Sequence, residues 1–260
     1  MKEATLRDEI EELGPWFHNL HLPDGTQTAP DHRLGDFPAY KWRVLREQLP
    51  EDLSSWQVLD IGCNAGFYSF ELARLGAAVT AIDVDARYLA QARWAARQYG
   101  LQYEVRFEQM QVYDLAHRAE TYDLVIFMGV LYHLRYPLLG LDIVASKVRR
   151  LMAFQTLTIE GEHHVVEETS GHGMADREVL DAPGWPKLAF LEHRFENDPT
   201  NWWVPNHAAV EALLRSSGMR VVCRPGQEIY MCEPDPENPS CVSTWNAAEL
   251  HSATGRSRPR

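Results

Sequence analysis

The feature that most constrains this chain is an apolar run that passes directly into a turn of small residues. Residues 58–61 (Val-Leu-Asp-Ile) have the composition of a strand buried on both faces. Residues 62–66 (Gly-Cys-Asn-Ala-Gly) follow, and residues 67–75 then show helical spacing up to Gly76. Glycines after a strand permit positive φ and let the backbone approach a ligand. The order strand, turn, helix predicts an α/β domain with a ligand-binding turn.

The rest of the chain repeats this alternation. We expect strands at 57–63, 78–84, 103–107, 122–129 and 151–159, with helices at 67–75, 86–99 and 138–148 between them. Such alternation predicts a parallel sheet with right-handed crossovers. After a helix at 206–217, residues 219–223 and 228–232 flank Pro225-Gly226 and predict an antiparallel hairpin. We therefore predict a Rossmann-like, doubly wound sheet of seven strands.

We expect three parts in the chain. Residues 1–50 form an N-terminal helical arm and flap, residues 51–233 the α/β domain with an insertion at 160–205, and residues 234–260 a mostly disordered tail. The stretch 16–25 is rich in aromatics and turn formers. It either packs on the core as an arm or closes over a small-molecule site, and the pattern fits both.

Composition limits the partners and the location. The formal net charge is 25 − 37 = −12, which argues against a broad nucleic-acid-binding face. No apolar run approaches the roughly 20 residues of a membrane span, and the N-terminus lacks a signal-peptide core. The four cysteines, Cys63, Cys223, Cys232 and Cys241, have no CxxC spacing. We expect a cytoplasmic protein with reduced thiols.

Asp83 narrows the ligand that the turn can bind. It ends the second expected strand about 20 residues after the turn, where a carboxylate can accept hydrogen bonds from both ribose hydroxyls. The turn lacks the GxGxxG spacing that seats a pyrophosphate, and no Walker lysine follows it. These residues predict a site for an adenosine without phosphates, a description that S-adenosylmethionine fits.

Residues 58–66, Asp83 and the block Met128-Gly129-Val130-Leu131-Tyr132-His133 resemble a class I S-adenosylmethionine-dependent methyltransferase. Within that superfamily the chain is similar to the tRNA wobble-uridine carboxymethyltransferases over roughly residues 16–232. The resemblance implies an enzyme that transfers a methyl or carboxymethyl group. It also implies the cofactor-binding residues Asp60, Gly62, Cys63, Asn64, Gly66, Asp83, Val84, Gln111, Val112, Met128, Lys41 and Trp42.

One position departs from that family. Members that use carboxy-S-adenosyl-L-methionine hold its extra carboxylate partly with a lysine, and His18 stands at the matching place here. Because histidine is charged only conditionally, it is a weaker partner for a carboxylate. We therefore expect ordinary S-adenosyl-L-methionine as the cofactor and a different, small acceptor.

The acceptor side offers fewer signals. Methyl transfer is an in-line displacement that mainly requires positioning, and a base is needed only for a protonated acceptor. Tyr132 is the expected pocket wall, and His133 either acts as the base or hydrogen-bonds backbone. Trp202 and Trp203 either frame a flat or sugar-like acceptor or anchor the insertion. The expected catalytic residues are His133 and Tyr132, and the expected substrate-binding residues are His18, Tyr132, Asn201, Trp202 and Trp203.

No metal site is expected. Glu160, Glu162, His163, His164 and His172 could supply ligands, but they lack ligand spacing. Three functions remain open: a small-molecule methyltransferase, a tRNA modifier, and a binding protein without activity. The intact Gly62, Gly66 and Asp83 argue against the last. A basic rim would favour the tRNA modifier, and its candidate residues are Arg43, Arg46, Lys147, Arg149 and Arg150.

Overall fold

The computed structural model describes residues 5–159, 172–237 and 244–255. Seven strands form one mixed sheet in the order β3-β2-β1-β4-β5-β9-β8, and β6 pairs with β7 in a separate two-stranded sheet. The predicted seven-stranded, Rossmann-like sheet with a C-terminal antiparallel hairpin is thereby confirmed. The chain divides into two compact units, Met1–Asp114 with Tyr122–Ile126, and Leu115–Thr121 with Phe127–Arg260.

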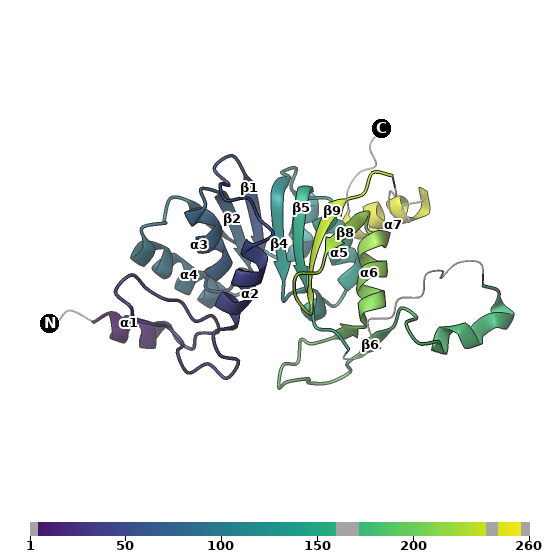
Figure 1. The fold of residues 1–260 in the computed structure, drawn as a ribbon, viewed down its shortest axis with the longest axis horizontal. Helices are drawn as coiled ribbons and strands as arrows, with labels where there is room; N and C mark the ends of the chain where they lie inside the picture. Colours follow the sequence, from purple (N-terminus) through teal and green to yellow (C-terminus); the bar gives the residue numbers. More distant parts are fainter. Residues whose placement is uncertain (1–4, 160–171, 238–243, 256–260) are drawn as a thin grey trace. The chain divides into compact units, whose positions relative to one another are not determined.

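The first unit contains the strand–turn–helix segment and the N-terminal residues (Figure 1). β1 pairs in parallel with β2, and β2 with β3, so that Ile61 lies opposite Ile82 and Asp83 opposite Gln109. This register brings the carboxyl ends of the three strands to one edge. The elements are α1 (Leu6–Leu13), α2 (Phe37–Arg46), β1 (Gln57–Ile61), α3 (Phe67–Arg74), β2 (Ala78–Asp83), α4 (Ala86–Tyr99) and β3 (Val105–Gln109).

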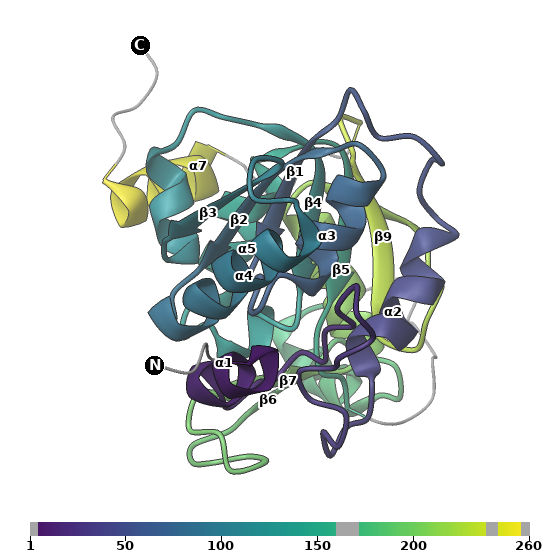
Figure 2. The ribbon, with the colours of Figure 1, turned by 90° about the vertical axis from the view of Figure 1, so that its left-hand side faces the viewer.

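The N-terminal helix α1 lies beside α4, as Figures 1 and 2 both show. α4 begins and ends as the sequence predicts. The Asp85 side chain accepts a hydrogen bond from the Arg87 amide, and Gly100 ends the helix at φ 71°. Two elements bridge the units in sequence: the 3₁₀ helix η1 (Val112–His117) and β4 (Tyr122–Met128).

The second unit holds the antiparallel strands. β5 pairs antiparallel with β9, β9 with β8, and α6 packs on β8. Asn206 caps α6 through the amide of Ala209, as predicted. The elements are η2 (Leu131–His133), α5 (Pro137–Ala145), β5 (Val148–Gln155), η3 (Met174–Asp181), β6 (Leu188–Phe190), β7 (Trp203–Pro205), α6 (His207–Ser216), β8 (Met219–Cys223), β9 (Ile229–Pro234) and α7 (Thr244–Thr254).

Two predicted element boundaries were wrong in this unit, and the tail also differs from its prediction. The helix expected at 138–148 ends at Ala145, and the strand expected at 151–159 starts at Val148 and ends at Gln155. The apolar run continues from helix into strand, so periodicity alone cannot place the boundary. The tail expected to be mostly disordered contains α7, in which the Thr254 hydroxyl donates to the carbonyl of Leu250.

The core of each unit is continuous and apolar. β1 and β4 are buried along almost their whole length, as their apolar sequences predict for strands covered on both faces. No helix in the part of the chain that the structure describes is long and apolar enough to cross a membrane.

Candidate cofactor and acceptor sites

The turn after β1 contains residues in the left-handed backbone conformation, as its sequence predicts. Gly62, Asn64 and Gly66 have φ angles of 70°, 52° and 89°, a region that favours glycine and that asparagine tolerates. The amides of Gly62 and Cys63 both donate to the carbonyl of Ile82, at 2.8 and 3.1 Å. A Cβ at Gly66 would lie 2.8 Å from the Phe70 ring. The turn is therefore locked to β2, and glycine at 66 is required by conformation and by space.

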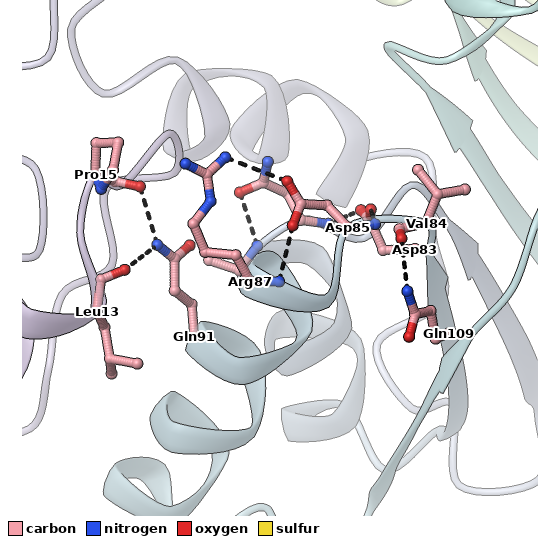
Figure 3. Close-up of polar contacts among 10 residues, drawn as sticks. Leu13, Pro15, Asp83, Val84, Asp85, Arg87, Gln91 and Gln109 are labelled. Atoms are coloured by element: carbon pink, nitrogen blue, oxygen red, sulfur yellow. Dashed lines mark hydrogen bonds and ion pairs between the residues drawn. The ribbon is translucent and has the colours of Figure 1, made fainter.

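The Asp83 carboxylate links the turn to α4 (Figure 3). One oxygen accepts the Asn64 amide at 2.8 Å, and the other accepts the Asp85 amide at 2.9 Å. The side chain is buried, and burial raises the pKa of Asp83 although the amides of Asp85 and Asn64 oppose that shift. An ionised carboxylate has about four acceptor positions. Each oxygen can thus accept one further hydrogen bond, such as one from a ribose hydroxyl.

The residues beside Asp83 include an exposed apolar side chain and a hydrogen-bonded strand end. Val84 is 49% exposed although it is apolar, and the Gln109 side chain donates to its carbonyl at 3.0 Å (Figure 3). The Met110 amide donates to the Asp83 carbonyl. Gln111 and Val112 therefore follow directly after a residue bonded to Asp83. The structure brings together eight of the predicted cofactor-binding residues: Gly62, Cys63, Asn64, Gly66, Asp83, Val84, Gln111 and Val112.

Asp60 lies beneath the turn and is buried. Its carboxyl accepts a hydrogen bond of 2.6 Å from the Ser69 hydroxyl on α3. Burial raises the pKa of Asp60 to about 7, the bond from Ser69 opposes the rise, and the Asp83 charge adds to it. Cys63 is fully buried as predicted. Asp60 and Ser69 thus connect β1 to the helix that starts at the turn, and Ser69 was not among the predicted site residues.

The N-terminal segment packs against the helices on either side of the turn. Gln91 of α4 donates to the carbonyls of Leu13 and Pro15, at 2.8 and 3.0 Å (Figure 3). The Tyr99 hydroxyl donates to the carbonyl of His21 at 2.9 Å. Gln91 is completely buried, yet an isolated polar residue on a helix gives no signal of this role. The segment expected as arm or flap is therefore held in place by α4.

His18 lies in an aromatic cage next to the turn. Its ring packs edge-on against Phe37, Phe67 and Tyr68, with centroids 5.7 to 6.3 Å apart. Phe67 and Tyr68 are the first two residues after Gly66, so the segment reaches the start of α3. Burial, with the neighbouring charges of Lys41 and then His32, lowers the pKa of His18 to about 3. Nδ1 of His18 has no hydrogen-bond partner.

Lys41 and Trp42 occupy neighbouring positions on α2 but different surroundings. The Lys41 ammonium lies 5.6 Å from the Phe37 ring centre and close enough to His18 to affect its pKa. Trp42 lines a cavity of about 420 Å³ whose walls include Phe70 and Tyr99. The polar residues that line this cavity include His21, whose Nε2 lies 2.6 Å from Asp36, and Arg74, which is paired with Glu71. We assign no ligand to this cavity.

The second unit contains Met128, Tyr132 and His133. Met128 ends β4 and is buried, and Tyr132 and His133 belong to η2. Burial raises the pKa of Tyr132 to about 12, helped by the charges of Glu228 and Asp198. The two rings are 4.3 Å apart between centroids. Tyr132 is thus protonated and half-buried beside His133.

His133 has side-chain partners that the sequence did not indicate. Its Nδ1 lies 2.9 Å from the Thr200 hydroxyl, which donates to the Asp198 carboxylate at 2.6 Å. Burial lowers the pKa of His133, and the Asp198 charge opposes that shift. Asp198-Pro199-Thr200 has the sequence of a turn. That signal could have marked these residues only once the loop was known to lie beside η2.

Trp202 forms an aromatic surface with residues of the two-stranded sheet. Its ring stacks with Phe190 at 6.4 Å and an angle of 12°, and the Arg135 guanidinium lies 4.5 Å from the Trp202 ring centre. The Trp202 amide donates to the Tyr132 carbonyl at 2.8 Å. Asn201 is buried and donates to the Phe195 carbonyl. The Trp202 backbone thus ties the insertion to η2, and the Phe190 ring, which contacts both Trp202 and Trp203, is 49% exposed.

The metal candidates fall mostly outside the described residues. Glu160, Glu162, His163 and His164 lie in residues 160–171, whereas His172 packs against Trp185. Over residues 5–159, 172–237 and 244–255, no group of three or more His, Cys, Asp or Glu side chains is arranged to hold a metal ion.

Comparison with known proteins agrees with this geometry. A family model described as "Methyltransferase domain" matches residues 58–153. The tRNA U34 carboxymethyltransferase of Pseudomonas aeruginosa is 26% identical over 219 residues, and that of Idiomarina loihiensis is 33% identical over 222 residues. These matches cover 83% and 84% of this chain, but only 59% and 60% of the relatives. The chain thus spans about three fifths of the length of the curated relatives it matches.

Solved structures share the fold. The N-terminal domain of EvdMO1, crystallised with SAH bound, aligns with a TM-score of 0.61 at 20% identity, covering 90% of this chain and 97% of that one. A Burkholderia thailandensis 1,6-didemethyltoxoflavin-N1-methyltransferase aligns with a TM-score of 0.52 at 15% identity, covering 76% and 78%. The chain therefore has the fold of these proteins, and residues 58–153 match the methyltransferase-domain model. In sequence it is similar to the tRNA U34 carboxymethyltransferases.

Proposed function

We propose that this protein is an S-adenosyl-L-methionine-dependent methyltransferase that acts on a small-molecule acceptor. The observation that carries the proposal is Asp83, whose two carboxylate oxygens each retain an acceptor position beside the Gly62–Gly66 turn. A ribose has two adjacent hydroxyls, which such a carboxylate can accept together. The exposed Val84 next to it offers an apolar face for adenine.

The residues around the turn fit this cofactor and not a dinucleotide. The amides of Gly62, Cys63 and Gly66 donate to backbone carbonyls within the turn and to β2, so they do not converge on a phosphate. When bound, the cofactor supplies an electrophilic methyl group on a sulfonium. The protein then has to position the acceptor and exclude water.

His18 supports the ordinary cofactor over its carboxylated form. A lysine at this position would place a charge for an extra carboxylate, whereas the imidazole is buried among aromatic rings and has its pKa lowered to about 3. A neutral ring gives no charge-assisted hydrogen bond. Lys41 is the nearby cation. The distinction between the two cofactors therefore rests on His18.

The acceptor site is assigned to Tyr132, His133, Asn201, Trp202 and Trp203. Trp202, Phe190 and Arg135 form a stacked surface of rings and a guanidinium. Such a surface suits a planar or sugar-like acceptor. A tRNA acceptor is the alternative, because the two curated relatives described above are named for tRNA U34.

The charge of the chain favours the small molecule. The net charge is −12, and one candidate residue of the basic rim is not on the surface. Lys147 is buried, and its ammonium donates to the Arg118 carbonyl, so this residue does not contribute to a basic rim. A cytoplasmic location is consistent with this role and remains a prediction.

Two measurements test the proposal. Mass spectrometry of the ligand that co-purifies should give S-adenosyl-L-methionine or its demethylated product, whereas a carboxylated species would refute the cofactor assignment. Transfer of a deuterated methyl group should then be screened over metabolite pools, with tRNA as a separate pool. Label in small molecules alone is the expected result, and label in the tRNA pool alone would establish the alternative.

A further inference from the structure

The loop before Trp202 holds the Asp198 carboxylate in a defined position. Phe195 and Asp198 bond to each other through both backbone amides, at 3.2 and 3.0 Å, and Glu196 and Asn197 between them have φ angles of 54° and 62°. Two successive left-handed residues make a tight hairpin turn. The left-handed backbone conformation is unfavourable for glutamate. Backbone strain of this kind is concentrated at functional sites.

The turn directs Asp198 toward Thr200. One oxygen of the Asp198 carboxylate accepts both the amide and the hydroxyl of Thr200, at 2.7 and 2.6 Å. The loop is also tied to η2, since the Trp202 amide donates to the Tyr132 carbonyl at 2.8 Å. His133 is the next residue of η2, and its Nδ1 lies 2.9 Å from the Thr200 hydroxyl oxygen.

The direction of these hydrogen bonds follows from counting protons. A threonine hydroxyl has one proton, and Thr200 donates it to Asp198. The Thr200 oxygen can therefore only accept from His133, so the proton of the neutral ring is on Nδ1. Nε2 then carries a lone pair. The charged or titratable groups that influence this ring are Asp198 and, in ring contact, the protonated Tyr132.

We propose that Asp198 and Thr200 are positioning residues that hold His133 as a general base with a free Nε2, and that the acceptor is therefore a hydroxyl group. This inference rests on the proposed methyltransferase function. An alcohol must lose its proton as its oxygen attacks, whereas an amine attacks through a lone pair it already has. The O–H bond breaks and the proton passes to Nε2. The oxygen forms the new bond to the methyl carbon, and the electron pair of the broken C–S bond stays on sulfur.

The tautomer can be tested without knowing the acceptor. Nitrogen-15 histidine NMR at pH 7.5 distinguishes protonated from unprotonated ring nitrogens, and His133→Gln identifies the signal among the 11 histidines. We expect protonated Nδ1 and unprotonated Nε2 in the wild type and in Thr200→Ser, which keeps the hydroxyl. The Asp198 Oδ2 atom also lies 3.7 Å from Nδ1, so both acceptors are removed in the double variant Asp198→Leu with Thr200→Val, which should move the proton to Nε2. A wild-type ring protonated on Nε2, or a double variant that matches the wild type, would overturn the proposal.

Calorimetry with S-adenosylhomocysteine, run on the same variants, separates this inference from the proposed function. Equal affinity in the wild type, the double variant and Thr200→Ser is expected, because none of these changes touches the turn or Asp83. No binding to the wild type would refute the proposed function and leave the tautomer result standing. In the labelled screen, a deuterated methyl on oxygen supports the inference, and one on sulfur, carbon or nitrogen contradicts it. His133→Gln should lower turnover at least about a hundredfold.

Discussion

In the turn at residues 62–66 and in the loop at 195–203, an aspartate carboxylate holds the backbone in place, but the two segments lie in different surroundings. Both use left-handed backbone and an aspartate that accepts amide hydrogen bonds. The turn is buried between a strand and a helix, and there is no room for a Cβ at Gly66. The loop is exposed at Phe195 and carries aromatic rings instead. A buried, fixed turn suits a ligand that never changes, and an exposed loop suits one that differs between relatives.

This difference also explains what the sequence could predict. The turn can be recognised from the sequence because the strand, the glycines and the helix are consecutive. Asp83 then follows at the end of the next strand. The His133 contacts come from residues 65 and 67 positions away, Asp198 and Thr200, which no local pattern connects to η2. Likewise, Ser69 and Gln91 are ordinary helix residues in sequence. The start of β5 was misplaced because the apolar pattern runs through it, and α7 was missed because polar composition does not exclude a helix.

The largest effect should come from removing the carboxylate that the turn and β2 share. Asp83→Ala should weaken S-adenosylhomocysteine binding by about 4 kcal/mol, roughly a thousandfold, because two charge-assisted hydrogen bonds to ribose are lost. Isothermal titration calorimetry measures this. Asp83→Asn should fall in between, since an amide can still accept from one hydroxyl. Wild-type affinity in Asp83→Ala would remove the residue from the cofactor site.

A second test asks whether the turn is as rigid as its contacts indicate. Gly66→Ala should lower the free energy of unfolding by about 3 kcal/mol, from the left-handed φ and from overpacking against Phe70. The control is Gly100→Ala, which has a similar φ of 71° but no atom within 4 Å of the added Cβ. It should cost about 1 kcal/mol. Equal losses in urea unfolding would mean that packing at the turn is unimportant.

The buried Asp60 should make the stability of the folded protein depend on pH. Its folded pKa of about 7 lies above that of an unfolded aspartate, so the folded state binds the extra proton and loses stability as pH rises. Between pH 5 and 7 this loss is about 2 kcal/mol. Asp60→Asn should abolish it. Unfolding curves for both proteins at pH 5, 6 and 7 in the absence of cofactor measure the difference, and parallel curves would show that Asp60 is ionised throughout.

The smallest effect concerns cofactor choice at His18. His18→Lys should shift the ratio of affinities toward carboxy-S-adenosyl-L-methionine about tenfold, the contribution of one charge-assisted hydrogen bond. His18→Gln is the neutral control and should leave the ratio unchanged. Competition binding with both cofactors gives the ratio directly. A glutamine variant that behaves like the lysine variant would show that charge at this position is irrelevant.

The account depends on the turn and its neutral His18 selecting ordinary S-adenosyl-L-methionine. The most direct test is calorimetry on the wild-type protein with S-adenosyl-L-methionine and with its carboxylated form under the same conditions. We predict 1:1 binding of the ordinary cofactor and affinity for the carboxylated form at least about tenfold weaker, because the neutral His18 offers the extra carboxylate no charge-assisted hydrogen bond. Tighter binding of the carboxylated form would contradict the account.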